Sequence, residues 1–512
     1  MAGYDYIIVG AGSAGCVLAN RLSADGDVLV LEAGEQDDRR EISIPIAYPE
    51  LWGSAVDWVF QTAPQAELND RRLDVVQGKM IGGSSSINAQ VYLRGHAADY
   101  DGWAAAGNDG WDPDTVIERF ERIEDGPGDH YGSGGPQQIE QQDSPHPLSS
   151  AFVDAAVETG LQRIRCLNDG DLDGVGFTEV TQQGHKRHSA ADAFLKPVLD
   201  RASLTAETGA RVRRVVFDED RATGVVYEQA GETERATASE EVILSAGAIN
   251  SPRLLMLSGI GPAEHLREHG IDIEVNLPGV GRNLQDHPIV HLPYESRTDD
   301  THGNADTILN LLKYLLLKRG PLTSNGLEAA GYWRSDGDLA APDIQFVFSP
   351  AYLENGDLSE EHNGFSIGTA LVDPQSSGRV TLRSADPSDD PEIDPQYLAA
   401  DGDFEALRRG VRKAREIANA DPLAARRADG TDAPDRPEPL IRSGTVPYAH
   451  FSGTCKMGDG EMAVVDDRLS VRGVEGLRVV DASIMPTIPR VNTHAPTMVI
   501  AESASEFITG GD

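Results

Sequence analysis

The first 32 residues carry a complete dinucleotide-binding pattern, and this pattern strongly constrains the fold of the chain. An apolar run over residues 6–9 leads into the glycine turn GAGSAG of residues 10–15, and a second apolar run over residues 28–31 ends at Glu32. Strand, turn, helix, strand and acid follow in the order of a βαβ unit. In such a unit Gly10 permits the tight turn, Gly12 lets backbone approach a pyrophosphate, and Gly15 lets the helix pack closely on the sheet.

This unit predicts a cofactor that contains adenosine diphosphate. Its phosphates would lie at the helix N-terminus, where unpaired N–H groups and the helix dipole favour negative charge. Glu32 stands where a carboxylate accepts hydrogen bonds from a ribose 2′-hydroxyl, and it would repel the 2′-phosphate of NADP. The residues expected to bind the cofactor here are Gly10, Gly12, Ser13, Ala14, Gly15, Glu32 and Ala33.

The chain is strongly acidic, with 44 Lys and Arg against 83 Asp and Glu and a net charge of −39. Nucleic acid and anionic membranes would be repelled by this charge, so neither is expected as a partner. Self-repulsion should destabilise the compact state unless ions screen it. We therefore form the hypothesis of a halophilic type of acidic surface, suited to a high-salt cytoplasm. The alternative is an ordinary acidic soluble enzyme.

Three further features bear on location and metal binding. No basic stretch precedes the first apolar run, so we expect no signal peptide and a cytoplasmic protein. The apolar segment 307–317 is too short to span a bilayer and contains Lys313. It predicts a core or interface helix without stable membrane insertion, a membrane-touching lid being the alternative. Cys16, Cys166 and Cys455 lack metal-ligand spacing, so we expect free thiols and no metal site.

Later segments suggest a second domain and further cofactor contacts. A chain of 512 residues favours two domains. The glycine and hydroxyl cluster of residues 78–88 suits a pyrophosphate or an isoalloxazine edge, although a serine-rich surface loop is the alternative. Residues 241–247 form a buried strand entering a turn, after which Ser251 and Pro252 are expected to start a helix. Short strand-like runs over residues 342–394 indicate an antiparallel sheet, the expected substrate domain.

Two histidines near the C-terminus lie in distinctive surroundings. His450 opens the segment HFSGTCKMG, and His494 lies in NTHAPT. Between them, residues 477–480 form an apolar run that ends in Asp481. An isolated histidine is more often structural than catalytic, so composition alone leaves both residues undecided.

Five separated motifs together resemble the glucose-methanol-choline (GMC) flavoprotein oxidoreductases, nearest to the choline-dehydrogenase-like branch, along essentially the whole chain. They are residues 10–15 with Glu32, residues 78–95, residues 247–261, residues 279–288 and the two C-terminal histidine segments. The resemblance implies an α/β fold with a Rossmann-like FAD-binding domain and an antiparallel-sheet α+β substrate domain. The FAD-binding domain would comprise residues 1–140, 191–290 and 441–512, and the substrate domain residues 141–190 and 291–440.

The resemblance also implies FAD as the cofactor and assigns residues to it. Those that match the family's FAD site, beyond the N-terminal unit, are Gly83, Ser84, Asn88, Val91, Val212, Ala246, Asp481, Ala482 and Thr497. Some members carry a histidine at the position of Ile87 that bonds covalently to the flavin. Because Ile87 cannot form that bond, FAD is expected to be held noncovalently.

The implied activity is oxidation of a primary alcohol to an aldehyde. His450 matches the family's catalytic histidine and His494 the second position, which is His or Asn among relatives. Imidazole titrates near neutral pH and suits the removal of the hydroxyl proton. A hydroxynitrile-lyase-type enzyme on the same scaffold is the alternative, and an NAD-dependent dehydrogenase is a weaker one.

The substrate is less constrained by the sequence. Choline-type members need carboxylate and aromatic faces for a quaternary ammonium, and Glu328, Tyr332 and Trp333 cluster suggestively. A solvated Glu beside core aromatics is an equal alternative, and an uncharged primary or aromatic alcohol is the broader expectation. The sequence leaves open the electron acceptor, oxygen or another, and the oligomeric state.

Overall fold

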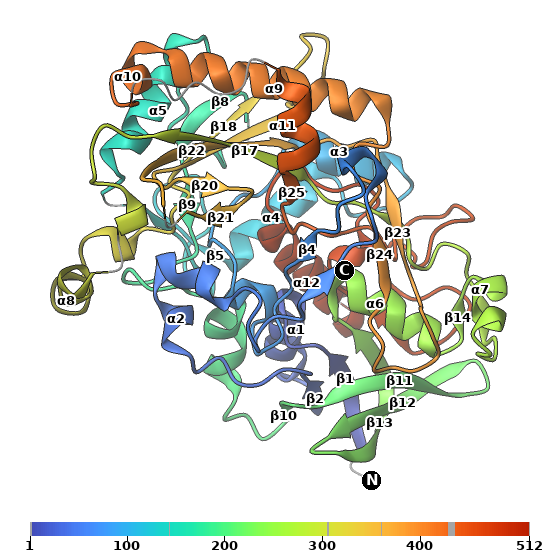
Figure 1. The fold of residues 1–512 in the computed structure, drawn as a ribbon. Helices are drawn as coiled ribbons and strands as arrows, with labels where there is room; N and C mark the ends of the chain where they lie inside the picture. The colour runs from blue at the N-terminus through green and yellow to red at the C-terminus, as the bar shows by residue number, and fades with distance from the viewer. Residues whose placement is uncertain are drawn as a thin grey trace.

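The computed structural model describes residues 3–142, 144–170, 172–304, 307–359, 361–428 and 436–510. Two large sheets organise the molecule, one at the bottom and one at the top of Figure 1. The chain passes between them several times, because strands from distant parts of the sequence join each sheet. The predicted α/β architecture with a separate antiparallel sheet is confirmed. The domain boundaries at residues 140, 190, 290 and 440 stay a prediction.

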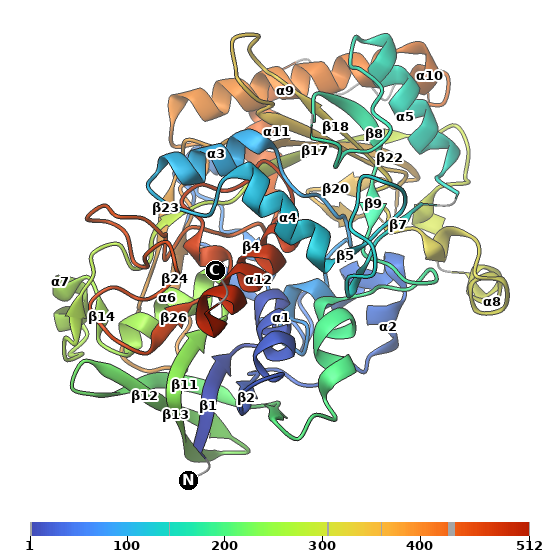
Figure 2. The same ribbon diagram turned by 180° about the vertical axis from the view of Figure 1, so that it is seen from behind.

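The lower sheet has seven strands and a parallel centre that contains the predicted βαβ unit. Helix α1 (Ser13–Leu22) connects its first two strands and packs against α12 (His494–Thr509) in both views of the fold (Figures 1 and 2). Residues 211–218 and 221–229 form a hairpin at the antiparallel edge, as their two apolar runs joined by a polar turn predict. In sheet order the strands are β10 (Leu204–Glu207), β2 (Val28–Leu31), β1 (Gly3–Val9), β13 (Glu232–Leu244), β12 (Arg221–Gln229) and β11 (Arg211–Asp218), with β26 (Leu477–Val479) also beside β13.

The upper sheet is antiparallel and has six strands, two of them within the run predicted over residues 342–394. Helices α5 (Pro147–Glu158) and α9 (Asp401–Asn419) lie over it (Figure 2), and Phe152, Phe346, Phe348 and Phe365 fill the apolar layer between. In sheet order the strands are β25 (Thr445–Pro447), β17 (Pro288–Glu295), β22 (Gly364–Leu371), β19 (Ile344–Ser349), β18 (Ala329–Trp333) and β8 (Gly174–Phe177).

Smaller elements connect these layers. A three-stranded sheet consists of β16 (Arg282–Leu284), β23 (Gly378–Thr381) and β24 (Glu392–Asp394). The remaining α-helices are α2 (Arg40–Ser43), α3 (Ala97–Ala105), α4 (Pro113–Ile123), α6 (Gly247–Leu257), α7 (Ala263–Glu268), α8 (Ile308–Leu317), α10 (Asp421–Ala424) and α11 (Pro437–Gly444). The short strands are β3 (Phe60–Gln61), β4 (Asp74–Val75), β5 (Glu124–Asp125), β6 (Gln137–Gln138), β7 (Glu140–Gln141), β9 (Glu179–Val180), β14 (Ile260–Gly261), β15 (Val275–Asn276), β20 (Leu353–Glu354) and β21 (Asp357–Leu358).

Helix α6 begins at Gly247, four residues before the start expected at Ser251 and Pro252. Asp481 reaches across from the end of β26 and accepts the Gly247 N–H at 2.9 Å, so the helix is capped by a distant residue. Pro252 cannot bond to the Ala248 carbonyl, and the Thr454 hydroxyl donates to that carbonyl instead at 2.6 Å. Both partners come from the C-terminal part of the chain, and a local pattern cannot reveal them.

Helix α8 is not the core helix expected from residues 307–317. Its leucines are open to solvent, with Leu309, Leu312, Leu315, Leu316 and Leu317 between 48% and 75% exposed. The helix lies at the edge of the molecule, away from both sheets (Figure 1). In the described part of the chain, no helix is both long and apolar enough to cross a membrane.

Candidate functional site

A long cavity lies at the carboxyl ends of the parallel strands in the lower sheet. Its empty volume, including the open mouth, is about 1450 Å³. Val9, Leu31, Ser245 and Asp481 line it at or just beyond the ends of four strands, where open α/β sheets bind ligands. The lining contains His450, His494 and every predicted cofactor-binding residue except Gly15.

The three glycines of the first turn have different surroundings. A Cβ on Gly15 would lie 1.9 Å from the Gly10 carbonyl oxygen, so only glycine allows α1 to pack this closely on β1. Gly10 has a φ of +101°, and a Cβ there would lie 2.6 Å from the Ser245 carbonyl oxygen. A Cβ on Gly12 would meet no heavy atom within 4 Å. Gly15 therefore serves packing, whereas Gly12 leaves open space at the helix N-terminus.

Glu32 is buried, and both of its carboxylate oxygens accept backbone N–H groups. Oε2 accepts from Ala11 and Oε1 from Gly34, each at 2.8 Å. Burial raises the pKa of Glu32 to about 6 despite these hydrogen bonds. The carboxylate thus holds the glycine turn against the end of β2 while it also lines the cavity.

The glycine and hydroxyl cluster of residues 78–88 lies directly against the first turn. The Gly82 N–H donates to the Ala11 carbonyl at 2.8 Å, and a Cβ on Gly83 would lie 2.8 Å from the Gly12 Cα. Asn88 accepts a hydrogen bond from the buried Arg187 at 2.7 Å. Two motifs separated by some seventy residues therefore form one wall of the cavity.

His450 is held by hydrogen bonds at both ring nitrogens. Nε2 lies 3.1 Å from the Asn492 amide nitrogen, and Nδ1 lies 2.9 Å from Nδ1 of His287. An amide NH₂ only donates, so Nε2 of neutral His450 accepts and its proton is on Nδ1, from which it donates to His287. Burial lowers the pKa of His450 to about 3 and holds that of His287 well below its usual range. Both rings are therefore neutral, with the basic lone pair of His450 on Nε2.

The backbone of His450 is fixed as well. Its N–H donates to Oδ1 of the buried Asp286 at 2.6 Å. Tyr397 donates its hydroxyl to the other oxygen of this carboxyl group. Tyr448 packs on the imidazole, with ring centroids 4.3 Å apart. These contacts leave His450 little freedom to move.

His494 begins α12 and lines the same cavity. Its Nδ1 lies 2.9 Å from the Ser13 hydroxyl at the start of α1. Burial, together with the positive charge of Arg187, lowers the pKa of His494 to about 4. Nε2 has no hydrogen-bond partner among the described residues, so it is available to a bound molecule.

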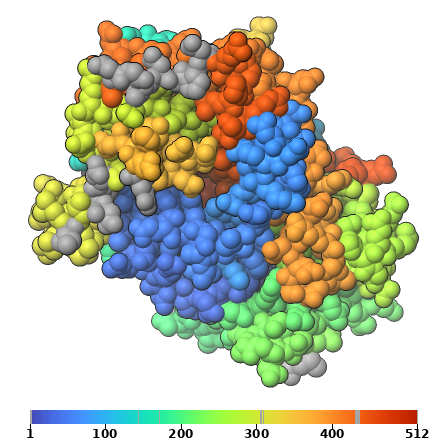
Figure 3. Space-filling model, viewed as in Figure 1, coloured from blue at the N-terminus to red at the C-terminus, as the bar shows by residue number. Residues whose placement is uncertain are grey.

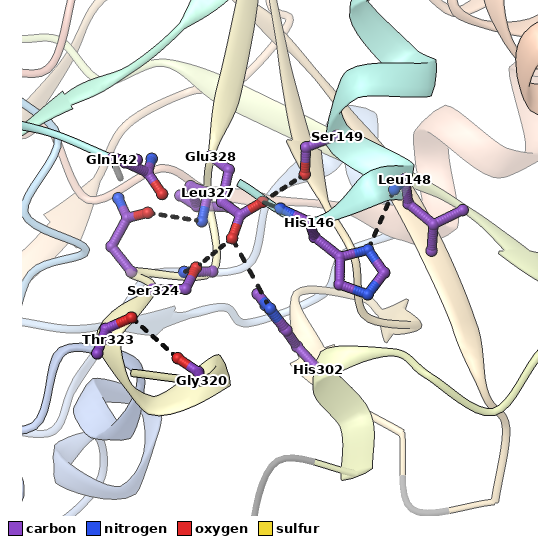
Figure 4. A network of polar contacts seen from close by, with 12 residues as sticks. Gln142, His146, Leu148, Ser149, His302, Gly320, Thr323, Ser324, Leu327 and Glu328 are labelled. Carbon is purple, nitrogen blue, oxygen red and sulfur yellow. Dashed lines mark hydrogen bonds and ion pairs between the residues drawn. The ribbon is translucent and has the colours of Figure 1, made fainter. Parts of the chain in front are cut away.

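The predicted substrate residues lie elsewhere. Glu328 is 1% exposed and accepts hydrogen bonds from Ser149, Ser324 and the His146 N–H, each at 2.6 Å (Figure 4). It borders a different cavity, whereas Tyr332 is buried beneath Gln345 and Trp333 packs against the core of the upper sheet. The structure therefore does not bring these three side chains to the cavity of His450 and His494. Tyr332 and Trp333 are successive residues of β18, so their side chains point to opposite faces of the sheet, and Glu328 lies just before this strand. The three residues are adjacent in sequence but do not share a site.

Sequence reasoning missed His287, Asn492 and Arg187 as neighbours of the histidine pair. His287 was within the segment 279–288 that carried the family resemblance, but nothing local distinguishes it from a structural histidine. Arg187 lies in a turn among other polar residues. Of the three, only Asn492 could have been suspected from the sequence, because it lies two residues before the predicted His494.

The residues present fit FAD. The space above Gly12 and the N-terminus of α1 suits a pyrophosphate. Three buried polar atoms in the lining, Ser245 Oγ, Asn492 Oδ1 and His494 Nε2, have no hydrogen-bond partner among the described residues. Ile87, at the position that is histidine in covalently flavinylated relatives, packs in an apolar cluster with Ile42, Leu51, Val56 and Met80.

The fold and the site define a dinucleotide-dependent oxidoreductase with a histidine pair beside its cofactor cavity. The chain belongs to the GMC oxidoreductase family, whose models match residues 4–289 and 374–501. FAD is the cofactor, and noncovalent binding is consistent with the family.

Relatives match the chain over nearly all of its length. An uncharacterized GMC-type oxidoreductase of Mycobacterium tuberculosis is 43% identical over 98% of this chain and 99% of its own. An alcohol dehydrogenase [acceptor] of Pseudomonas putida is 41% identical over 99% and 95%, and human mitochondrial choline dehydrogenase is 39% identical over 99% and 90%. Among solved structures, pyridoxine 4-oxidase from Mesorbium loti has a TM-score of 0.90 at 33% identity and covers 98% of each chain.

Proposed function

We propose that the protein oxidises a primary alcohol to an aldehyde, with His450 as the base. The observation that carries this proposal is the tautomer of His450, which leaves the Nε2 lone pair on the wall of a cavity that also contains His494. A neutral imidazole with an accepting Nε2 is the form that takes a hydroxyl proton, and the substrate hydroxyl would replace the Asn492 amide as the donor to this nitrogen.

The roles of the two histidines follow from the charges that change in the reaction. The substrate loses its hydroxyl proton to Nε2 of His450 and a hydride from its carbon, and becomes the aldehyde. FAD, when bound, supplies the hydride acceptor at flavin N5. The protonated His450 then stabilises the negative charge that grows on the substrate oxygen. His494 orients that oxygen by a hydrogen bond from Nε2, and in this tautomer the Ser13 hydroxyl donates to Nδ1.

His287 is the positioning residue of this arrangement. Its Nδ1 accepts the Nδ1 proton of His450 at 2.9 Å, so it selects the tautomer in which Nε2 is basic. When His450 gains the substrate proton, the same acceptor stabilises the imidazolium. This role parallels that of the aspartate in a catalytic triad, with a neutral ring in place of a carboxylate.

An uncharged primary alcohol is the substrate class that we propose. The relatives named as an alcohol dehydrogenase and a choline dehydrogenase both act on alcohols by their names. The carboxylate predicted to hold a quaternary ammonium, Glu328, borders another cavity and is occupied by internal hydrogen bonds. This placement favours a neutral alcohol over choline.

Anaerobic mixing of the purified holoprotein with a panel of alcohols tests the proposal. The flavin absorbance should bleach with at least one primary alcohol and recover on addition of an electron acceptor. His450→Ala and His494→Ala should keep bound FAD but lose this bleaching, His450→Ala by about 100-fold or more. His362→Ala, which removes an exposed histidine of the substrate domain, serves as the matched control.

Two results would contradict the proposal. Full bleaching in His450→Ala removes the assignment of the base. Yellow protein that no alcohol bleaches but that cleaves a cyanohydrin establishes the lyase alternative.

A further inference from the structure

Helix α8 presents a leucine face that nothing in the described chain covers. The exposed fractions are 62% for Leu309, 48% for Leu312, 56% for Leu315, 75% for Leu316 and 65% for Leu317. In Figures 1 and 3 the helix forms a separate lobe at the left edge of the molecule. Monomeric proteins rarely expose so many adjacent large apolar side chains, and such patches mark interaction sites.

The opposite side of α8 attaches it to the body. Tyr314 is 2% exposed and clusters with Leu322, and Leu311, Ile44 and Ile46 pack against them. The Tyr314 hydroxyl donates to the carbonyl of His185 at 3.2 Å. At 100° per residue, Leu309, Leu312 and Leu316 lie on the side away from Tyr314. The helix is therefore held by one side with its leucine face directed outward.

The sequence segment that contains this face is positively charged, in contrast to the chain as a whole. Residues 307–327 contain Lys313, Lys318 and Arg319 and no Asp or Glu, with Asp306 and Glu328 as the nearest acids in sequence. Only seven lysines occur in a chain of net charge −39, and two of them lie here. Lys313 and Arg319 are exposed.

We propose that α8 docks the protein reversibly on an anionic lipid membrane surface. The leucines would enter the boundary of the acyl chains while the three cations contact lipid phosphates, as in interfacial amphipathic helices. A helix of ten residues is too short to span a bilayer, so this is surface attachment. A protein-binding hot spot would be expected to contain Trp, Tyr or Arg at its centre, whereas this face consists of leucine.

The acidic body does not prevent this docking at 0.15 M ionic strength. The Debye length is about 8 Å at 0.15 M ionic strength, so charges farther than this from the membrane are screened. Because α8 projects from the body (Figures 1 and 3), docking through its leucine face would bring its own cations to the lipid surface. The proposal is independent of the activity proposed above.

Vesicle flotation of the holoprotein tests the proposal. In 0.15 M KCl the protein should float with vesicles of equal parts phosphatidylglycerol and phosphatidylcholine more than with pure phosphatidylcholine. In 1 M KCl, where the Debye length is about 3 Å, the preference should disappear while binding persists. Leu312→Asp with Leu316→Asp should weaken binding at least tenfold, and Lys313→Gln and Lys318→Gln should each weaken binding to the anionic vesicles about fivefold.

The controls match the variants in residue type and exposure. Leu199→Asp removes a leucine that is 45% exposed elsewhere, and Lys186→Gln removes an exposed lysine outside α8. Both should bind like the parent protein, and the flavin spectrum confirms that every variant is folded. Three results would overturn the proposal. The first is no flotation of the parent protein, and the second is flotation that the paired leucine substitution leaves unchanged. The third is a parent protein that binds no vesicles but self-associates, with the paired leucine substitution abolishing that self-association.

Discussion

At the scale of single residues, burial decides the protonation of the candidate catalytic groups. His450, His494 and His287 have pKa values lowered chiefly because a charged ring is poorly solvated in the protein. The neighbouring carboxyl group of Asp286 has its pKa raised to about 7 by the same cause. His450 is therefore neutral at neutral pH, and its Nε2 remains unprotonated well below neutral pH.

This protonation predicts an unusual pH dependence of flavin reduction. A group whose pKa is lowered stays deprotonated above that lowered value, so His450 remains neutral as the pH falls through 6.5. The rate of anaerobic flavin bleaching by a good alcohol should be nearly constant from pH 8 to about 5 and should fall only below that.

Stopped-flow measurement of the bleaching rate against pH checks this expectation, with the flavin spectrum recorded at each pH to confirm that the holoprotein is intact. An acid limb near pH 6.5 would show that His450 titrates like a solvent-exposed histidine and would contradict the expectation.

At the scale of secondary-structure elements, the cofactor site depends on how closely α1 approaches β1. Gly15 allows that approach, and Gly12 leaves the space at the end of the helix open. The same turn is contacted by the segment of residues 78–88 and, through Ser13, by the start of α12. Substitutions at different glycines of this turn should therefore have different effects, one on the stability of the fold and the other on cofactor binding.

Three Gly→Ala substitutions test this separation. Gly15→Ala places a Cβ against the Gly10 carbonyl and should destabilise the fold by about 3 kcal/mol or more. Gly12→Ala meets no protein atom, so it should preserve the apoprotein's stability but weaken FAD binding. Gly102→Ala in α3 also meets no atom within 4 Å and should stabilise by about 0.5–1 kcal/mol.

Denaturant unfolding of the apoprotein and fluorescence titration with FAD measure the two effects. Equal stability of the Gly15→Ala and Gly102→Ala variants would show that the contact at Gly15 is relieved without cost.

At the scale of the whole molecule, the net charge of −39 must be accommodated by a fold with 44 cationic residues. Several of these cations join distant segments. Arg490 pairs with Asp99 and with Asp373, and the buried Arg94 pairs with Glu124. Such pairs satisfy individual acids but leave most of the negative charge unpaired, so mutual repulsion opposes the compact state.

Salt should therefore stabilise the protein strongly. Between about 0.1 and 2 M KCl the melting temperature should rise by about 10 °C or more, because counterions screen the repulsion in the folded state. Scanning calorimetry of the holoprotein at saturating FAD measures this rise, and sucrose at equal osmolality is the uncharged control. A melting temperature independent of KCl would refute the hypothesis of a halophilic surface.

The sequence predicted those parts of the fold that depend on local patterns. The βαβ unit, the hairpin at the edge of the lower sheet and the antiparallel strands of residues 342–394 all have periodicity and turn residues that act over a few positions. The family resemblance predicted that the distant motifs belong to one FAD-binding protein, and all of them except the segment 279–288 contribute residues to the cavity lining.

The sequence did not reveal contacts between residues distant in the chain. The cap of α6 by Asp481, the pairing of His287 with His450 and the burial of Glu328 away from the site each depend on residues more than 150 positions apart. The sequence left open whether the apolar helix of residues 307–317 is a core helix, an interface helix or a membrane-touching lid, and only the fold shows that the leucines of α8 are exposed.

By itself, the sequence determined the dinucleotide-binding unit, because residue type and short spacing specify it. The resemblance to a known family supplied FAD and the two candidate histidines. The tertiary structure alone decided which nitrogen of His450 is basic, which predicted residues share the cavity and which apolar helix stays in solvent. The physical reason is that hydrogen-bond partners and burial are set by three-dimensional packing, and the protonation of a histidine depends on both.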